Sequence, residues 1–117
     1  MKLTFIGSGN VAWHLAQAFE KTSHHSVAEV YSRSLTNAKK LTAKLYNATA
    51  TNSLDFTQSK AEVFFIAVTD DALAHIAAEI RFPKDVIVLH TSGAQSVEVL
   101  DSIKNVKTGV FYPLQTF

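Results

Sequence analysis

The sequence predicts a three-layer α/β fold in which helices cover both faces of a doubly wound, mainly parallel sheet. Three observations support this prediction. Strand-length apolar runs alternate with amphipathic stretches of helical period along the chain, an order that is typical of parallel sheets. Residues 63–68, Val-Phe-Phe-Ile-Ala-Val, are continuously apolar, as in a strand that is buried on both faces. A turn with two glycines, at 7–12, joins the first strand-like run to the first helical one.

The first half of the chain carries three expected strands and two expected helices. The first helix has apolar residues at positions i, i+4, i+7 and i+8, which places them on one buried face. Strands are expected over 3–7, 26–31 and 48–51, and helices over 10–21 and 36–45.

The second half continues the same alternation. No internal repeat, linker or low-complexity tract interrupts the 117 residues, so we expect residues 1–117 to form a single domain. The expected elements are a strand over 62–68, a helix that starts at 69–71 and ends before Pro83, a strand over 86–90, a short helix after Ser92 and a last strand over 108–112.

Composition excludes several classes of function. The charges are scattered and nearly balanced, with 11 Lys and Arg against 10 Asp and Glu, which argues against a nucleic-acid groove or a membrane-surface helix. The chain has no cysteine, so thiol catalysis and cysteine-ligated zinc are excluded. No histidine has a spacing with carboxylates that suggests a metal site. No signal peptide or bilayer-length apolar stretch occurs, and a cytoplasmic location is therefore expected.

The turn at 7–12 is a candidate phosphate site. Gly7 would permit the tight bend after the strand, Gly9 would let a pyrophosphate approach the backbone, and Ala12 would allow close packing of helix on sheet. The alternative is a strand–helix turn with incidental glycines, but the flanking strand and helix favour dinucleotide binding. The residues expected to hold the pyrophosphate are Gly7, Ser8, Gly9, Asn10 and Val11.

A second candidate site follows the strand over 26–31. Ser32, Arg33 and Ser34 stand where a dinucleotide fold contacts the adenosine ribose. An Asp or Glu there would hold the ribose hydroxyls of NAD, whereas an Arg with hydroxyl donors suits the 2′-phosphate of NADP. The nearest acid, Glu29, falls inside the strand and too early for the ribose. We therefore expect NADP, the alternative being that Ser34 or Thr36 merely caps the next helix and Arg33 is solvated.

Thr69 and Asp70 follow the central strand at the sheet edge where open α/β folds bind ligands. Their main expected role is capping, with Thr69 or Asp70 at the N-cap and Asp71 favoured by the helix dipole. We also expect the backbone of Val68, Thr69 and Asp70 to contact the ribose on the nicotinamide side of a cofactor.

His90 and Ser92 follow the fifth expected strand at the same edge. His90 could donate a proton to a carbonyl or imine as hydride arrives, with Ser92 beside it. Two structural alternatives compete with this role. A single histidine at a strand end is often simply packed, and Ser92 with Gln95 matches a capping box.

Five segments, occurring together and in order, resemble one family across essentially the whole chain. It is an uncharacterised bacterial family of Rossmann-type, NADP-binding oxidoreductases, related to deazaflavin-dependent NADP oxidoreductases and pyrroline-5-carboxylate reductases. The segments are Gly-Ser-Gly-Asn-Val-Ala-Trp-His-Leu-Ala at 7–16, Tyr-Ser-Arg-Ser at 31–34, Val-Thr-Asp-Asp-Ala at 68–72, His-Thr-Ser-Gly-Ala at 90–94 and Gly-Val-Phe-Tyr-Pro-Leu-Gln-Thr-Phe at 109–117.

The resemblance implies a second, mostly helical domain that closes the substrate site and often dimerises. We expect this sequence to be a fragment without that domain, which binds cofactor without turnover; the alternative is a free-standing cofactor-binding domain. Dimerisation is expected through the missing domain or through apolar side chains exposed near the end of the chain. Those side chains are Phe111, Tyr112, Leu114 and Phe117.

The expected function is an NADP-binding domain of an oxidoreductase. Hydride would pass between the nicotinamide and a small carbonyl, imine or hydroxy-acid substrate, which the sequence does not identify. One alternative is a non-catalytic NADP-binding sensor or scaffold. Another ligand, S-adenosylmethionine, is disfavoured because its unphosphorylated ribose calls for an acid where Arg33 stands.

Overall fold

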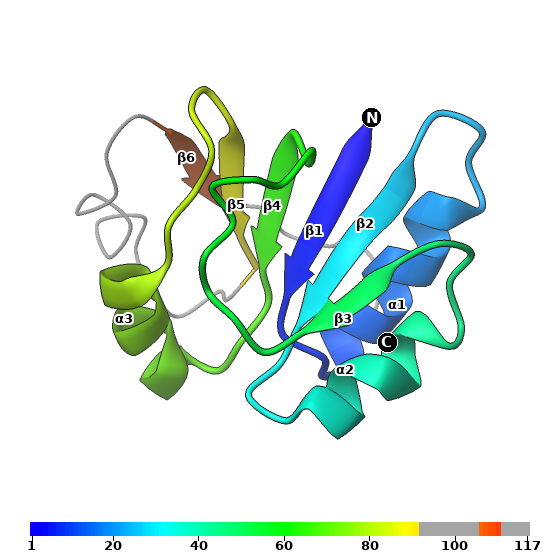
Figure 1. The fold of residues 1–117 in the computed structure, drawn as a ribbon, viewed down its shortest axis with the longest axis horizontal. Helices are drawn as coiled ribbons and strands as arrows, with labels where there is room; N and C mark the ends of the chain where they lie inside the picture. The colour runs from blue at the N-terminus through cyan, green and yellow to red at the C-terminus, as the bar shows by residue number, and fades with distance from the viewer. Residues whose placement is uncertain (92–105, 111–117) are drawn as a thin grey trace.

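The computed structural model describes residues 1–91 and 106–110 (Figure 1). In this part of the chain, six parallel strands form one sheet in the order β3-β2-β1-β4-β5-β6. The strands are β1 (Lys2–Ile6), β2 (Ser26–Tyr31), β3 (Thr49–Thr51), β4 (Val63–Ile66), β5 (Ile87–His90) and β6 (Lys107–Val110), and the helices are α1 (Asn10–Glu20), α2 (Leu35–Thr42) and α3 (Asp70–Glu79).

The strand order makes the sheet doubly wound. The chain builds outward from β1 to β2 and β3, then returns to the other side of β1 for β4, β5 and β6. The direction of winding therefore reverses between β1 and β4. In such sheets the carboxyl ends of the two strands diverge at this reversal and leave a crevice for a ligand. The predicted α/β, doubly wound parallel fold is confirmed.

Two apolar cores lie on the two faces of the sheet. On one face, α1 and α2 pack against Leu3, Phe5, Val63 and Phe65. On the other, residues of α3 join a core that includes the alternate strand residues of β1, β4 and β5. All four residues of β4 are buried, which explains why this strand is apolar without alternation.

Element boundaries differ from the predictions by a few residues. β2 has the predicted bounds, but β4 ends at Ile66 rather than 68, because Ala67 and Val68 already lead toward α3. α2 ends at Thr42 rather than 45, since the last N–H groups bond three residues back instead of four. Some predictions lie outside the described residues, among them the helix after Ser92, the last two residues of the final strand, and the apolar side chains of Phe111, Tyr112, Leu114 and Phe117.

Within the described ranges, no helix has both the length and the apolar character that crossing a bilayer requires.

Candidate functional site

The turn between β1 and α1 is held tightly against β4. Gly7 has φ of +121°, and its N–H donates to the Tyr31 carbonyl at 2.8 Å. A Cβ at this position would lie 2.3 Å from the carbonyl oxygen of Ala67, whose own N–H donates to Ile6. Both the backbone conformation and the space available therefore require glycine. The turn lies at the reversal of winding, beside the end of β4.

Gly9 occupies the N-cap of α1, with ordinary extended torsions of φ −80° and ψ −169°. Its carbonyl accepts the Trp13 N–H at 2.9 Å. Among the described residues, no atom beyond its chain neighbours lies within 4 Å of a Cβ placed here. Glycine has no side chain to bond the first-turn N–H groups, and the first turn has no acid. Among the described residues, no side chain therefore caps the N–H groups at the positive end of this helix.

The residues around Gly9 suit the close approach of a ligand. Asn10 is exposed, whereas Ser8 and Val11 are half-buried. Ala12 is completely buried in the core between α1 and the sheet. A larger side chain there would push the helix away, so this small residue fixes where the helix N-terminus points.

The segment after β2 forms a second wall at the same end of the sheet. The Ser32 N–H donates to the Thr51 carbonyl at 3.1 Å, which ties the segment to the end of β3. The Ser32 hydroxyl accepts the Ser34 N–H at 3.3 Å. Ser34 is the N-cap of α2, and its hydroxyl accepts the Asn37 N–H at 3.3 Å. The capping alternative is thus realised by Ser34, although both hydroxyl hydrogens remain available to donate.

Arg33 lies between these two serines and is exposed. Within the described residues it forms no ion pair, since the pair found there joins His75 to Glu79. Glu29 is engaged elsewhere, accepting hydrogen bonds from the Thr4 and Ser59 hydroxyls. Arg33 is therefore the charged side chain of the segment 32–34.

The segment after β4 lies beside the glycine turn. Val68 Cγ1 is 3.2 Å from the position of a Cβ on Gly7. Thr69 is the N-cap of α3, but its side chain accepts no hydrogen bond from the first turn. Its carbonyl instead accepts the N–H groups of Ala72 and Leu73. Thr69 thus takes the predicted cap position without the predicted side-chain bond, and the side chain of Asp70 lies outside the described part.

His90 ends β5 at the same edge of the sheet, opposite Ile66 of β4. Its side chain is 0% exposed. Val88, two residues earlier, belongs to the core beneath α3, so strand alternation places His90 on that face. The next residue, Thr91, bonds the Ile66 carbonyl through its N–H and its hydroxyl. Ser92 lies outside the described residues, and the catalytic roles of His90 and Ser92 stay predictions.

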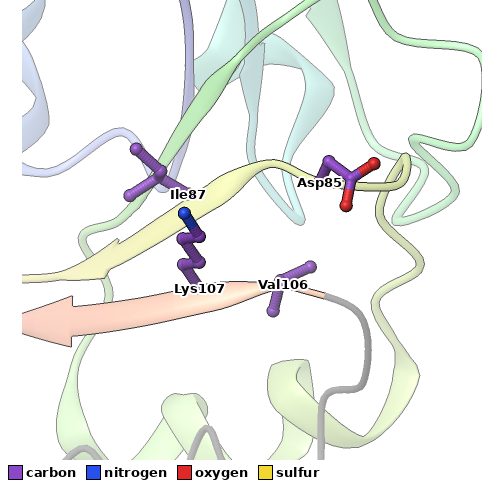
Figure 2. A pocket seen from close by; sticks show the side chains of 4 residues that line it. All are labelled: Asp85, Ile87, Val106 and Lys107. Atoms are coloured by element: carbon purple, nitrogen blue, oxygen red, sulfur yellow. The ribbon is translucent and has the colours of Figure 1, made fainter.

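In the described part of the structure, two hollows occur at the opposite, amino ends of the strands, and the sequence indicated neither. One, of about 470 Å³, is lined among the described residues by Asp85, Ile87, Val106 and Lys107, where β5 and β6 begin (Figure 2). The other, of about 440 Å³, lies against β1 and β2 and includes Glu29. In the described ranges, no three His, Asp or Glu side chains gather as a metal site would need.

The fold and the glycine turn define a class of protein. A parallel sheet in this order, with a glycine turn and an open helix N-terminus at the reversal of winding, is the dinucleotide-binding architecture of Rossmann type. The chain belongs to the Rossmann-like domain family, whose model matches residues 1–114. No curated protein matches the chain.

Several solved structures are similar to the chain. A proposed NADP oxidoreductase from Bacteroides fragilis is 30% identical, with a TM-score of 0.79 over 99% of this chain. A protein from Thermotoga maritima (23%, TM-score 0.70, 98% of this chain) and a pyrroline-5-carboxylate reductase from Coxiella burnetii (20%, 0.68, 86%) share the fold. This chain spans 45%, 41% and 38% of the lengths of these three proteins, respectively.

Proposed function

We propose that this chain is the NADP-binding domain of an oxidoreductase that acts on a small carbonyl, imine or hydroxy-acid substrate. The observation that carries the proposal is the uncapped N-terminus of α1, where a Cβ on Gly9 would meet no atom among the described residues. A pyrophosphate there would accept hydrogen bonds from backbone N–H groups and gain from the helix dipole. The similarity to the Bacteroides fragilis protein supports the oxidoreductase part of the proposal.

Each wall of the site has a role in this proposal. The backbone of Gly7, Ser8, Gly9, Asn10 and Val11 would hold the pyrophosphate. The backbone of Val68, Thr69 and Asp70 would contact the ribose next to the nicotinamide, because this segment lies against the glycine turn. Bound NADP would supply the hydride acceptor or donor at its nicotinamide ring.

NADP is preferred over NAD because of the segment after β2. Arg33 is an exposed cation between two serine hydroxyls. Each hydroxyl oxygen accepts a backbone N–H, which fixes its position and leaves the hydroxyl hydrogen free to donate to a phosphate. Capping by Ser34 and binding of a 2′-phosphate are therefore compatible.

Replacing Arg33 tests this proposal. Arg33→Ala should weaken NADPH binding while NADH binding changes little, because NADH has no 2′-phosphate. A charge-assisted hydrogen bond corresponds to roughly a ten- to hundredfold change in affinity. The dissociation constant for NADH divided by that for NADPH should therefore fall by that factor. Fluorescence titration with each cofactor measures the two constants.

Lys40→Ala is the matched control, because Lys40 is an exposed cation in the last turn of α2, away from the segment 32–34. This variant should keep the cofactor preference of the parent chain. An unchanged ratio in Arg33→Ala, or an equal fall in both variants, would rule out Arg33 as the phosphate ligand.

A non-catalytic NADP-binding sensor is the second candidate, and the burial of His90 favours it. A proton donor must reach the substrate, whereas the His90 side chain is 0% exposed in this chain. The two candidates differ in whether His90 contacts the nicotinamide. NMR signals of its imidazole, recorded with NADPH and with 2′,5′-ADP, which lacks that ring, would distinguish them.

A further inference from the structure

A groove of about 440 Å³, lined in part by charged and amide side chains, lies at the end of the sheet opposite to the dinucleotide site. The starts of β1 and β2 form its floor. The connection from β3 to β4, which crosses the sheet in front of these strands, forms its wall (Figure 1). The side chains that matter for the argument are Lys2, Glu29, Asn47, Gln58, Ser59 and Lys60.

A β-bulge brings Glu29 into this position. Leu3 pairs with Val27, but Thr4 pairs with Glu29, so Ala28 is an extra residue in β2. Bulges re-aim the side chain that follows them, and they often occur beside functional sites. Without the extra residue, regular alternation would place Glu29 on the other face of the sheet.

The carboxylate of Glu29 is fixed by one of its oxygens. Oε1 accepts the hydroxyl of Thr4 at 2.8 Å and the hydroxyl of Ser59 at 2.5 Å. Thr4 is completely buried. One hydrogen-bond donor to Glu29 therefore belongs to the core, and the other, Ser59, belongs to the connection from β3 to β4. Among the described residues, nothing donates to Oε2. One oxygen of an immobilised carboxylate is therefore available in the groove.

Two cations line the same groove without neutralising this carboxylate. Lys2 and Lys60 are exposed, and neither forms an ion pair with Glu29 in the described part of the chain. Groups of opposite charge thus line one space of small-metabolite size without pairing with each other. Asn47 and Gln58 add amide groups that can donate and accept hydrogen bonds.

We propose that this groove binds a small zwitterion with a primary ammonium group and a carboxylate, the chemical class of free amino acids. The ammonium group donates to Oε2 of Glu29, and the carboxylate accepts hydrogen bonds from Lys2 and Lys60. The site is separate from the dinucleotide site and does not depend on cofactor binding.

A series of ω-amino acids tests the proposal by NMR titration of the ¹⁵N-labelled chain. Glycine, 4-aminobutyrate and 6-aminohexanoate carry the same two groups at increasing separation. At least one should cause saturable shifts in the amide signals of Glu29, Ser59 and Lys60. Glycine betaine should cause none, because its quaternary nitrogen has no N–H to donate.

Two substitutions separate ligand binding from a structural role of Glu29. Glu29→Gln keeps an oxygen for the Thr4 and Ser59 hydroxyls but removes the charge, and it should weaken binding roughly ten- to a hundredfold. Lys60→Ala, on the rim of the groove, should also weaken binding, whereas Lys44→Ala, an exposed lysine outside the groove, should not.

Each variant is folded if its NMR spectrum keeps the dispersed amide signals of the parent chain. The proposal is overturned if no member of the series gives saturable shifts at the groove, if betaine binds equally well, or if Glu29→Gln binds as the parent does. The last result would mean that Glu29 has only a structural role, in holding the connection from β3 to β4 through its hydrogen bond with Ser59.

Discussion

Gly7→Ala should destabilise the protein severely and abolish cofactor binding. Alanine rarely adopts φ of +121°, and its Cβ would lie 2.3 Å from the Ala67 carbonyl oxygen. Backbone strain and overpacking together should cost on the order of 2–5 kcal/mol. That is a large share of the about 5–15 kcal/mol by which a domain of this kind is stable. Relief would require β4 and the glycine turn to separate, which opens the site itself.

Urea unfolding followed by circular dichroism measures this effect as a fall in the midpoint. The control is Gly9→Ala, the same substitution two residues later, where φ is −80° and the Cβ meets open space. A Gly7→Ala variant as stable as the parent chain would mean that the turn and β4 are not packed as described.

Gly9→Ala should leave the fold intact and weaken cofactor binding. Its torsions are ordinary for alanine, and the lower capping preference of alanine costs about 1 kcal/mol or less. The added methyl group, however, points into the space where a pyrophosphate would contact the backbone. We expect NADPH affinity to fall at least about tenfold, equivalent to about 1.4 kcal/mol.

Fluorescence titration with NADPH measures that affinity, and urea unfolding of the same preparation shows whether stability is retained. The two glycine variants would therefore separate two roles in the turn: Gly7 permits the backbone structure, and Gly9 would allow the proposed cofactor to approach the helix. Unchanged NADPH affinity in Gly9→Ala would mean that the pyrophosphate does not bind at this helix.

Much of the fold could be predicted because local pattern and tertiary position agree. The uninterrupted apolar run of β4 indicated a strand covered on both faces, and that burial is observed. The glycines of the first turn, flanked by a strand and a helix, indicated the tight strand–helix turn that the structure shows between β1 and α1. These patterns are local in sequence, so they can be interpreted without knowing which distant residues are in contact.

Other features depend on contacts between distant residues. The spacing of Gly7 suggested a tight bend, but the carbonyl of Ala67, sixty residues away, is what excludes a side chain. The sequence around Glu29 did not indicate its hydrogen bonds to Thr4 and Ser59. These bonds depend on the bulge in β2 and on the path of the connection from β3 to β4. Likewise, the burial of His90 follows from the packing around β5 and not from its neighbours in sequence.

Isothermal titration calorimetry of this chain with NADPH, NADH and S-adenosylmethionine tests the central claim most directly. The proposed site predicts saturable binding of one NADPH per chain, weaker binding of NADH and no measurable binding of S-adenosylmethionine. Absence of heat from all three ligands, with a chain shown to be folded, would contradict the claim that the glycine turn holds a dinucleotide.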